Sequence, residues 1–175
     1  DDLVELLAPA PEVARVLIDG LGGGRLADAM VARLVAAGRT PCRVRGADYL
    51  RPAGERYAYG REDPDAFREG WLDAGALRRE VLAADGTWLP KLRDAGSDRS
   101  ARLQRLPLPP RAVVLVDGLF LLGRDLPAEL TVHVALSPAA LLRQGVPTWQ
   151  LPAFTAYDAL VQPGASCDVL VRAED

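Results

Sequence analysis

The sequence predicts an α/β domain in which helices cover both faces of a central parallel sheet, giving three layers. Short apolar runs at 13–18, 112–116 and 130–136 have the length and β-branched content of buried parallel strands. Strands that alternate with helices within one domain favour a parallel sheet with right-handed crossovers. Such sheets bind their ligands at the carboxyl ends of the strands.

Length and composition indicate a single globular domain over residues 1–175. A chain of 175 residues with 49% apolar and 26% charged residues has the size and proportions of one domain with a full core. No apolar run approaches the roughly 20 residues that a membrane-spanning helix needs, so no membrane contact is expected. The segment 1–10 carries acids and lacks the basic flank of a secretory signal, so we expect a cytoplasmic protein.

Charged residues and cysteines exclude several classes of function. The formal net charge is −3 and the basic residues are spread along the chain, so no nucleic-acid partner is expected. Cys42 and Cys167 lack CxxC spacing, and with His133 alone they cannot form a zinc site of the usual kind. Of the 21 basic residues, 20 are arginine and one is Lys91, so any mechanism that needs a lysine depends on Lys91.

The first strand and the first helix are joined by glycines. The strand at 13–18 ends in Asp19-Gly20, and the helix is expected over 25–37, where apolar residues recur every three or four positions before Gly38. Further along, a second strand is expected near 42–44 and a last one near 169–171.

The middle of the chain is less regular. The segment 46–65 contains several prolines and glycines and is expected to form a loop. Good helix formers over 66–83 predict a helix, whereas 87–110 mixes charge, serine and proline without a clear period and is expected to be irregular. The strand at 112–116 ends in Asp117-Gly118, and His133 lies within the strand at 130–136, where packing is its expected role.

The glycines after the first strand suggest a phosphate-binding loop. Glycines let backbone N–H groups converge on a phosphate at a helix N-terminus. A working P-loop reads G-x-x-x-x-G-K-[ST], where the lysine reaches the phosphates and the hydroxyl holds Mg²⁺. Counted from Gly20, those last three positions hold Arg25, Leu26 and Ala27; the other interpretation is a tight turn without a ligand. The candidate nucleotide-binding residues are Gly20, Gly22, Gly23, Gly24 and Arg25.

The segment RVRGADYLRP at 43–52 resembles the uridine kinase family, especially its short actinobacterial-type members, whose second strand ends in a DDFLRP-like segment. The likeness covers nearly the whole chain from residue 13, through YGR at 59–61, PDAF at 64–67 and VDGLFLL at 116–122. It implies a P-loop NTPase-like three-layer fold. It also implies a kinase that uses ATP or GTP with Mg²⁺ and acts on a nucleoside or another small hydroxyl compound. Whether the protein forms a homo-oligomer stays an open question at this point.

The resemblance implies roles for individual residues. The family's catalytic base falls at Ala47, so the neighbouring Asp48 is the candidate base. Asp117 matches the family's metal-side acid, a candidate catalytic residue and Mg²⁺ ligand, although it could instead cap a turn. Arg143 is the one arginine that remains in the expected lid at 141–151. The candidate substrate-binding residues, for which a charged loop face is the alternative, are Tyr49, Arg61, Glu62 and Asp63.

Local departures from the family leave two functions open. Residues 25–28 align with the last four positions of the family's GKTTLAD, with Arg25 in place of the threonine, so Gly-Lys-Thr is missing after Gly24. The chain is therefore either a kinase that compensates elsewhere or a catalytically inactive nucleotide-binding pseudokinase. The shortenings fall in the phosphate loop, near residue 84 and in the lid, the mobile parts of such kinases. A chain from which those loop residues had been left out would read the same way.

Overall fold

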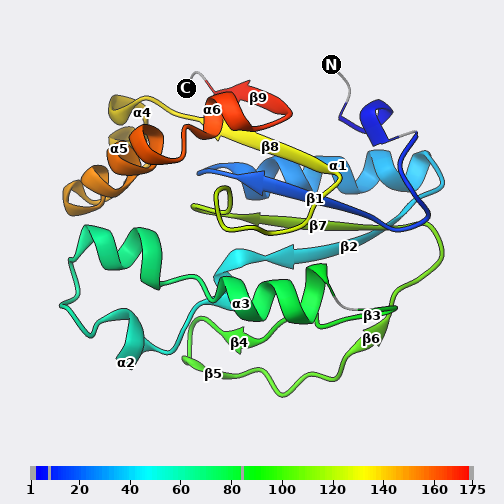
Figure 1. The fold of residues 1–175 in the computed structure, drawn as a ribbon, viewed down its shortest axis with the longest axis horizontal. Coiled ribbons are helices and arrows are strands. Elements are labelled where there is room, and N and C mark those ends of the chain that lie inside the picture. The colour runs from blue at the N-terminus through cyan, green and yellow to red at the C-terminus, as the bar shows by residue number, and fades with distance from the viewer. Residues whose placement is uncertain (1–2, 8, 84, 174–175) are drawn as a thin grey trace.

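The computed structural model describes residues 3–7, 9–83 and 85–173 (Figure 1). Within them lies a five-stranded sheet in the order β2-β7-β1-β8-β9, in which every neighbouring pair is parallel. This confirms the predicted α/β class. The strands of the sheet are β1 (Ala14–Asp19), β2 (Thr40–Arg45), β7 (Ala112–Gly118), β8 (Leu130–Ala135) and β9 (Val169–Arg172).

The central strands β1 and β7 are buried on both faces, as their nearly continuous apolar sequences require. Successive side chains of a strand point to opposite faces. On β1, Val16 and Ile18 therefore pack in one core cluster, and Leu17 packs in the other. The residues at 112–116 in β7 have no exposed surface at all.

The helices form the outer layers (Figure 1). On one face, α1 (Gly23–Ala36) buries Ala27, Met30 and Leu34, which share one side of a helix because they lie three or four residues apart. The opposite face is covered by α3 (Ala74–Leu77), the π-helical turn η4 (Arg78–Leu82) and α5 (Leu151–Leu160). No helix in the described part of the chain is long and apolar enough to cross a membrane.

Short elements connect these layers. The remaining helical turns are η1 (Glu5–Leu7), η2 (Gly46–Tyr49), α2 (Ala53–Arg56), η3 (Ala66–Gly70), α4 (Pro138–Arg143), η5 (Thr148–Gln150) and α6 (Pro163–Ser166). Two small antiparallel ladders pair β3 (Thr87–Trp88) with β6 (Leu106–Pro107) and β4 (Arg93–Asp94) with β5 (Arg99–Ser100).

The structure corrects the predicted helix at 66–83. The π-helical turn η3 ends at Gly70, Leu72 bridges to Leu50, and a new helix then begins. The carboxylate of Asp73 starts α3 because it accepts the N–H of Ala76 (2.9 Å), a hydrogen bond typical of a helix N-cap. The predicted helix at 66–83 is therefore divided at Asp73, a position that the spacing of apolar residues does not reveal as a helix start.

The register of the sheet brings the carboxyl ends of its central strands together. Asp19 pairs with both Gly118 and His133, and Arg45 pairs with Asp117. The turn that leads from β1 into α1 follows at the same edge, as the sequence predicts. Side chains from β1, β2, β7 and β8 thus meet where an α/β sheet binds its ligands.

Replacing Gly20 by Ala tests the packing of this turn. Gly20 has φ +106°, and a Cβ atom there would overlap the carbonyl oxygen of Val134 on β8. We expect Gly20→Ala to lower the free energy of unfolding by about 2–4 kcal/mol, measured by urea denaturation followed by circular dichroism. Gly54→Ala is the control, because Gly54 lies in α2 and a Cβ atom added there would meet no other atom within 4 Å. Equal effects of the two changes would contradict this account of the turn.

Candidate functional site

A cavity of about 350 Å³ lies at the carboxyl edge of β1, β2 and β7. We call it the strand-end cavity. Most of its wall is apolar, and the polar side chains in the wall are Arg45, Arg68 and Asp117. The apolar side chains are Leu21, Ala47, Leu50, Phe67, Trp71, Leu72, Leu119 and Phe120.

Aromatic rings stiffen one wall of the strand-end cavity. Phe67 packs edge-to-face on Trp71 (centroids 4.9 Å apart) and on Phe120 (5.2 Å). The indole N–H of Trp71 donates to the carbonyl of Arg56 (3.2 Å), which fixes the ring. A rigid apolar wall with a few polar groups is the usual composition of a small-molecule site and suits a flat ligand.

The glycine turn at 20–22 forms another wall of the cavity, and several of the backbone N–H groups in and just after it already have acceptors in the protein. The N–H of Gly20 donates to the carbonyl of Gly118 (2.9 Å), and the N–H of Gly23 donates to that of Gly20 (3.1 Å). The N–H groups of Arg25 and Leu26 both donate to the carbonyl of Gly22. Gly22 also has a positive φ of +91°, a conformation that favours glycine. The glycines therefore serve a tight turn, and these four N–H groups are not directed at a ligand.

Asp117, at the end of β7, is already paired with a cation. Its Oδ1 forms an ion pair with Nη1 of Arg43 on β2. Its Oδ2 lies against the first turn of α1, where a Cβ atom on Gly24 would be only 3.0 Å away. Among the described residues, no group of three or more His, Cys, Asp and Glu is placed to hold a metal ion.

A nucleoside triphosphate with Mg²⁺ does not fit this turn in the way a P-loop holds it. Positions 25–27 supply no lysine and no hydroxyl. Four N–H groups at the turn, those of Gly20, Gly23, Arg25 and Leu26, already donate to backbone carbonyls, and the acid that matches the metal ligand is bound to Arg43. The lysine and the hydroxyl that hold the phosphates and Mg²⁺ in a P-loop therefore have no counterpart at positions 25–27.

The candidate base Asp48 lies outside the wall of the strand-end cavity, whereas Ala47 lines it. The carboxylate of Asp48 forms an ion pair with the ammonium of Lys91 (3.4 Å), which also pairs with Asp94 (3.2 Å). The hydrogen bond to Asp94, followed by the charge of Asp48, raises the pKa of Lys91. The backbone N–H of Ser97 and the Lys91 ammonium lower the pKa of Asp94 to about 2. The only lysine of the chain therefore binds two carboxylates.

The candidate substrate-binding residues are dispersed. Tyr49 is fully buried and its hydroxyl donates to the carbonyl of Leu89; burial and the nearby Glu80 raise its pKa. Asp63 accepts the N–H of Ala66, the first residue of η3 (2.7 Å). Arg61 lies 5.0 Å above the ring of Tyr57 and Glu62 is exposed.

Arg143 is exposed at the end of α4 and lines a separate groove. That groove, of about 750 Å³, shares no lining residue with the strand-end cavity. Arg25 is also exposed and lies outside the cavity wall. Gly23 is buried and likewise does not line the cavity. Of the residues singled out in the sequence, the cavity gathers Gly20, Gly22, Gly24 and Asp117.

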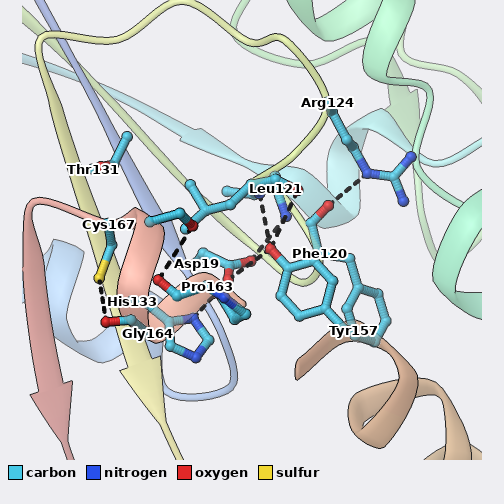
Figure 2. A network of polar contacts seen from close by, with 12 residues as sticks. Asp19, Phe120, Leu121, Arg124, Thr131, His133, Tyr157, Pro163, Gly164 and Cys167 are labelled. Carbon is cyan, nitrogen blue, oxygen red and sulfur yellow. Dashed lines mark hydrogen bonds and ion pairs between the residues drawn. The ribbon is translucent and has the colours of Figure 1, made fainter. Parts of the chain in front are cut away.

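A buried carboxylate that the sequence did not single out organises this edge (Figure 2). Asp19, with no exposed surface, accepts the N–H of Leu121 (2.8 Å) and the hydroxyl of Tyr157 (3.0 Å), and it contacts Nδ1 of His133 (2.7 Å). Burial, and then the charge of Asp19, raise the pKa of Tyr157. Asp19 thereby ties β1 to β8, to α5 and to the segment after β7.

This network adjoins the strand-end cavity. Asp19, His133 and Tyr157 line a hollow of about 50 Å³. The hollow and the cavity share four wall residues, among them Gly20 and Phe120. Asp117 is a candidate from the sequence because it is an acid at the carboxyl end of a buried strand. Asp19 has the same position at the end of β1, so the same criterion could have identified it as a candidate.

Comparison with solved structures identifies the fold. A possible uridine kinase from Bacillus stearothermophilus matches with a TM-score of 0.79 at 18% identity, over 96% of this chain and 93% of that chain. A provisionally assigned fructose transport system kinase from Silicibacter sp. TM1040 matches with a TM-score of 0.61 at 17% identity, over 95% and 94%. The chain thus has the P-loop NTPase-like three-layer fold of such kinases, as predicted. No protein-family model and no curated protein sequence matches it.

Asp19→Asn tests the role of the buried carboxylate. The amide would turn an NH₂ group toward donors that now point at oxygen, leaving buried donors without an acceptor. We expect the free energy of unfolding to fall by about 2–4 kcal/mol, measured by urea denaturation followed by tryptophan fluorescence. Asp125→Asn is the control; that side chain is 89% exposed and pairs with Arg78, so its loss should change stability by less than about 0.5 kcal/mol. A small effect at position 19 would mean that the network contributes little.

Proposed function

We propose that the protein binds a nucleoside or a similar small hydroxyl compound in the strand-end cavity, and that it transfers phosphate very poorly. One observation carries the proposal: an apolar, aromatic-walled cavity lies beside a short glycine turn at which the N–H groups of Gly20, Gly23, Arg25 and Leu26 already have backbone acceptors. The first feature supports ligand binding on the acceptor side. The second supports loss of the phosphate-binding side.

The chemistry of the cavity suits a ligand with a flat ring and hydroxyl groups. The wall formed by Phe67, Trp71 and Phe120 can pack against a planar base. Arg45 and Arg68 supply hydrogen-bond donors and Asp117 supplies an acceptor, so hydroxyl groups can be bound in a defined orientation. These residues hold and orient a ligand.

Poor phosphotransfer follows from what the chain places around the turn. A phosphate-clamping cation and a catalytic base each contribute about 10²-fold or more to such reactions. Lys91 pairs with Asp48 and Asp94, and the position that the resemblance gives to the base holds Ala47. Arg25 would have to neutralise the phosphates without a lysine or a P-loop hydroxyl.

A working kinase is the second candidate, and the fold favours it. The likeness to the Bacillus stearothermophilus protein extends over 96% of this chain. In that case ATP or GTP with Mg²⁺ would require the turn at 20–25 to open and Asp117 to leave Arg43, with Asp48 as the base and Arg143 as the lid cation. The assays below distinguish the two candidates.

Filling the cavity should weaken ligand binding. Ala47 is exposed and lines the cavity, so Ala47→Phe should weaken uridine binding at least about tenfold, as measured by isothermal titration calorimetry, while stability stays the same. Ala58→Phe is the control, since Ala58 is exposed and outside the cavity wall. Equal binding by the two variants would place the ligand elsewhere.

Turnover should be close to background. The protein is incubated with Mg·ATP or Mg·GTP and uridine or cytidine, and nucleoside monophosphate is followed by chromatography. A turnover of about 1 per second, within the usual range for enzymes, would overturn the proposed loss of activity and support the kinase candidate.

Restoring the missing residues should restore nucleotide binding. Gly-Lys-Thr is inserted between Gly24 and Arg25 in the Ala47→Asp background, and thermal unfolding is recorded with and without ATP. At a ligand concentration 100 times the dissociation constant, binding should stabilise the protein by about 2.7 kcal/mol. If ATP stabilises neither the original nor the altered chain, the turn does not correspond to a phosphate loop.

A further inference from the structure

The guanidinium of Arg43 lies in a ring of oxygen atoms. Nη1 contacts Oδ1 of Asp117 and donates to the carbonyl of Val44 (2.9 Å). Nη2 donates to the carbonyl of Gly24 (3.3 Å), and Nε donates to Oδ1 of Asp28 (3.3 Å). Two carboxylates and two carbonyls, from α1, β2 and β7, therefore surround one cationic group.

This set of oxygens is the kind that hard divalent cations prefer. Mg²⁺ and Mn²⁺ bind carboxylate and carbonyl oxygens and need only one or two carboxylates when water completes the shell. The side chains of Arg43 and Asp117 are each only 18% exposed, whereas that of Asp28 is 63% exposed. Oδ1 of Asp117 is consequently turned toward the arginine, and this side chain is largely but not fully shielded from solvent.

We propose that Arg43 is a built-in cation that takes the place of a divalent metal ion at Asp117, so that the strand-end cavity binds its ligand without metal. A guanidinium keeps its charge at any physiological pH, and its five N–H donors in a planar fork let it contact two carboxylates and two carbonyls at once. Because Arg43 belongs to β2, it also ties that strand to the first turn of α1. The statement about the ligand rests on the proposed function; the statement about the metal does not.

The test measures Mn²⁺ directly, by the loss of the electron paramagnetic resonance signal of the free ion. The original protein should leave the signal unchanged. Removing the cation in Arg43→Met should create a site with a dissociation constant of about 1 mM or tighter, in the range of weak oxygen sites. Arg43→Lys, which keeps a cation, should not bind Mn²⁺, nor should the double variant Arg43→Met with Asp117→Asn.

Arg51→Met is the matched control. Arg51 forms a surface pair with the single carboxylate of Glu55 (3.4 Å), so its removal should create no Mn²⁺ site. Circular dichroism checks that each variant is folded. If Arg43→Met does not fold, Arg43→Gln replaces it, because the amide removes the charge and keeps hydrogen-bonding capacity.

Two results of the resonance experiment would overturn the proposal. One is Mn²⁺ binding by the original protein that Asp117→Asn abolishes; the other is a folded Arg43→Met or Arg43→Gln that binds no Mn²⁺. Uridine binding is then measured by calorimetry with EDTA and with Mn²⁺, and the proposal expects equal affinity. A dependence on Mn²⁺ would contradict it. If uridine does not bind under either condition, the proposed function fails while the resonance result still decides the role of Arg43.

Discussion

The three-residue turn between β1 and α1 constrains the whole carboxyl edge of the sheet. With so few residues, the chain must reverse at Gly20 and Gly22 in conformations with positive φ, and Gly20 must lie against the backbone of β8. The helix then begins at once, so its first turn lies directly beside Asp117 and Arg43. A longer loop would hold α1 farther from these side chains and leave its N–H groups open to a phosphate.

Two acids at the ends of β1 and β7 hold this arrangement in place, in different ways. Asp19 accepts hydrogen bonds from neighbouring segments and contacts His133, so it acts through the directional bonds of a site closed to water. Asp117 is half-buried and acts through charge, with Arg43 as its partner. The first acid fixes β1 relative to β8 and α5. The second fixes β7 relative to β2 and α1, and the strand-end cavity lies between the two.

The likeness to solved structures therefore concerns the overall fold, whereas the local geometry concerns the side chains that could carry out chemistry. Strand order, crossovers and the position of the cavity follow the overall fold, which tolerates an identity of only 18% because burial patterns suffice to define it. Chemistry depends on a few side chains at the strand ends. In this chain Ala47 lines the cavity, Lys91 pairs with Asp48, and Arg43 is bound to Asp117.

The sequence by itself determined the parallel sheet, the glycine turn at its edge and the acid at the end of β7, because apolar strands and glycines act locally and leave a periodic trace. It did not predict the break at Asp73, the burial of Tyr49 or the pairing of Asp48 with Lys91. Those features join residues far apart in the chain, or compete with a local helix pattern. Only the tertiary structure decided these features. The same holds for the contacts of Arg43 and Asp19, because these contacts depend on which strands become neighbours in the sheet.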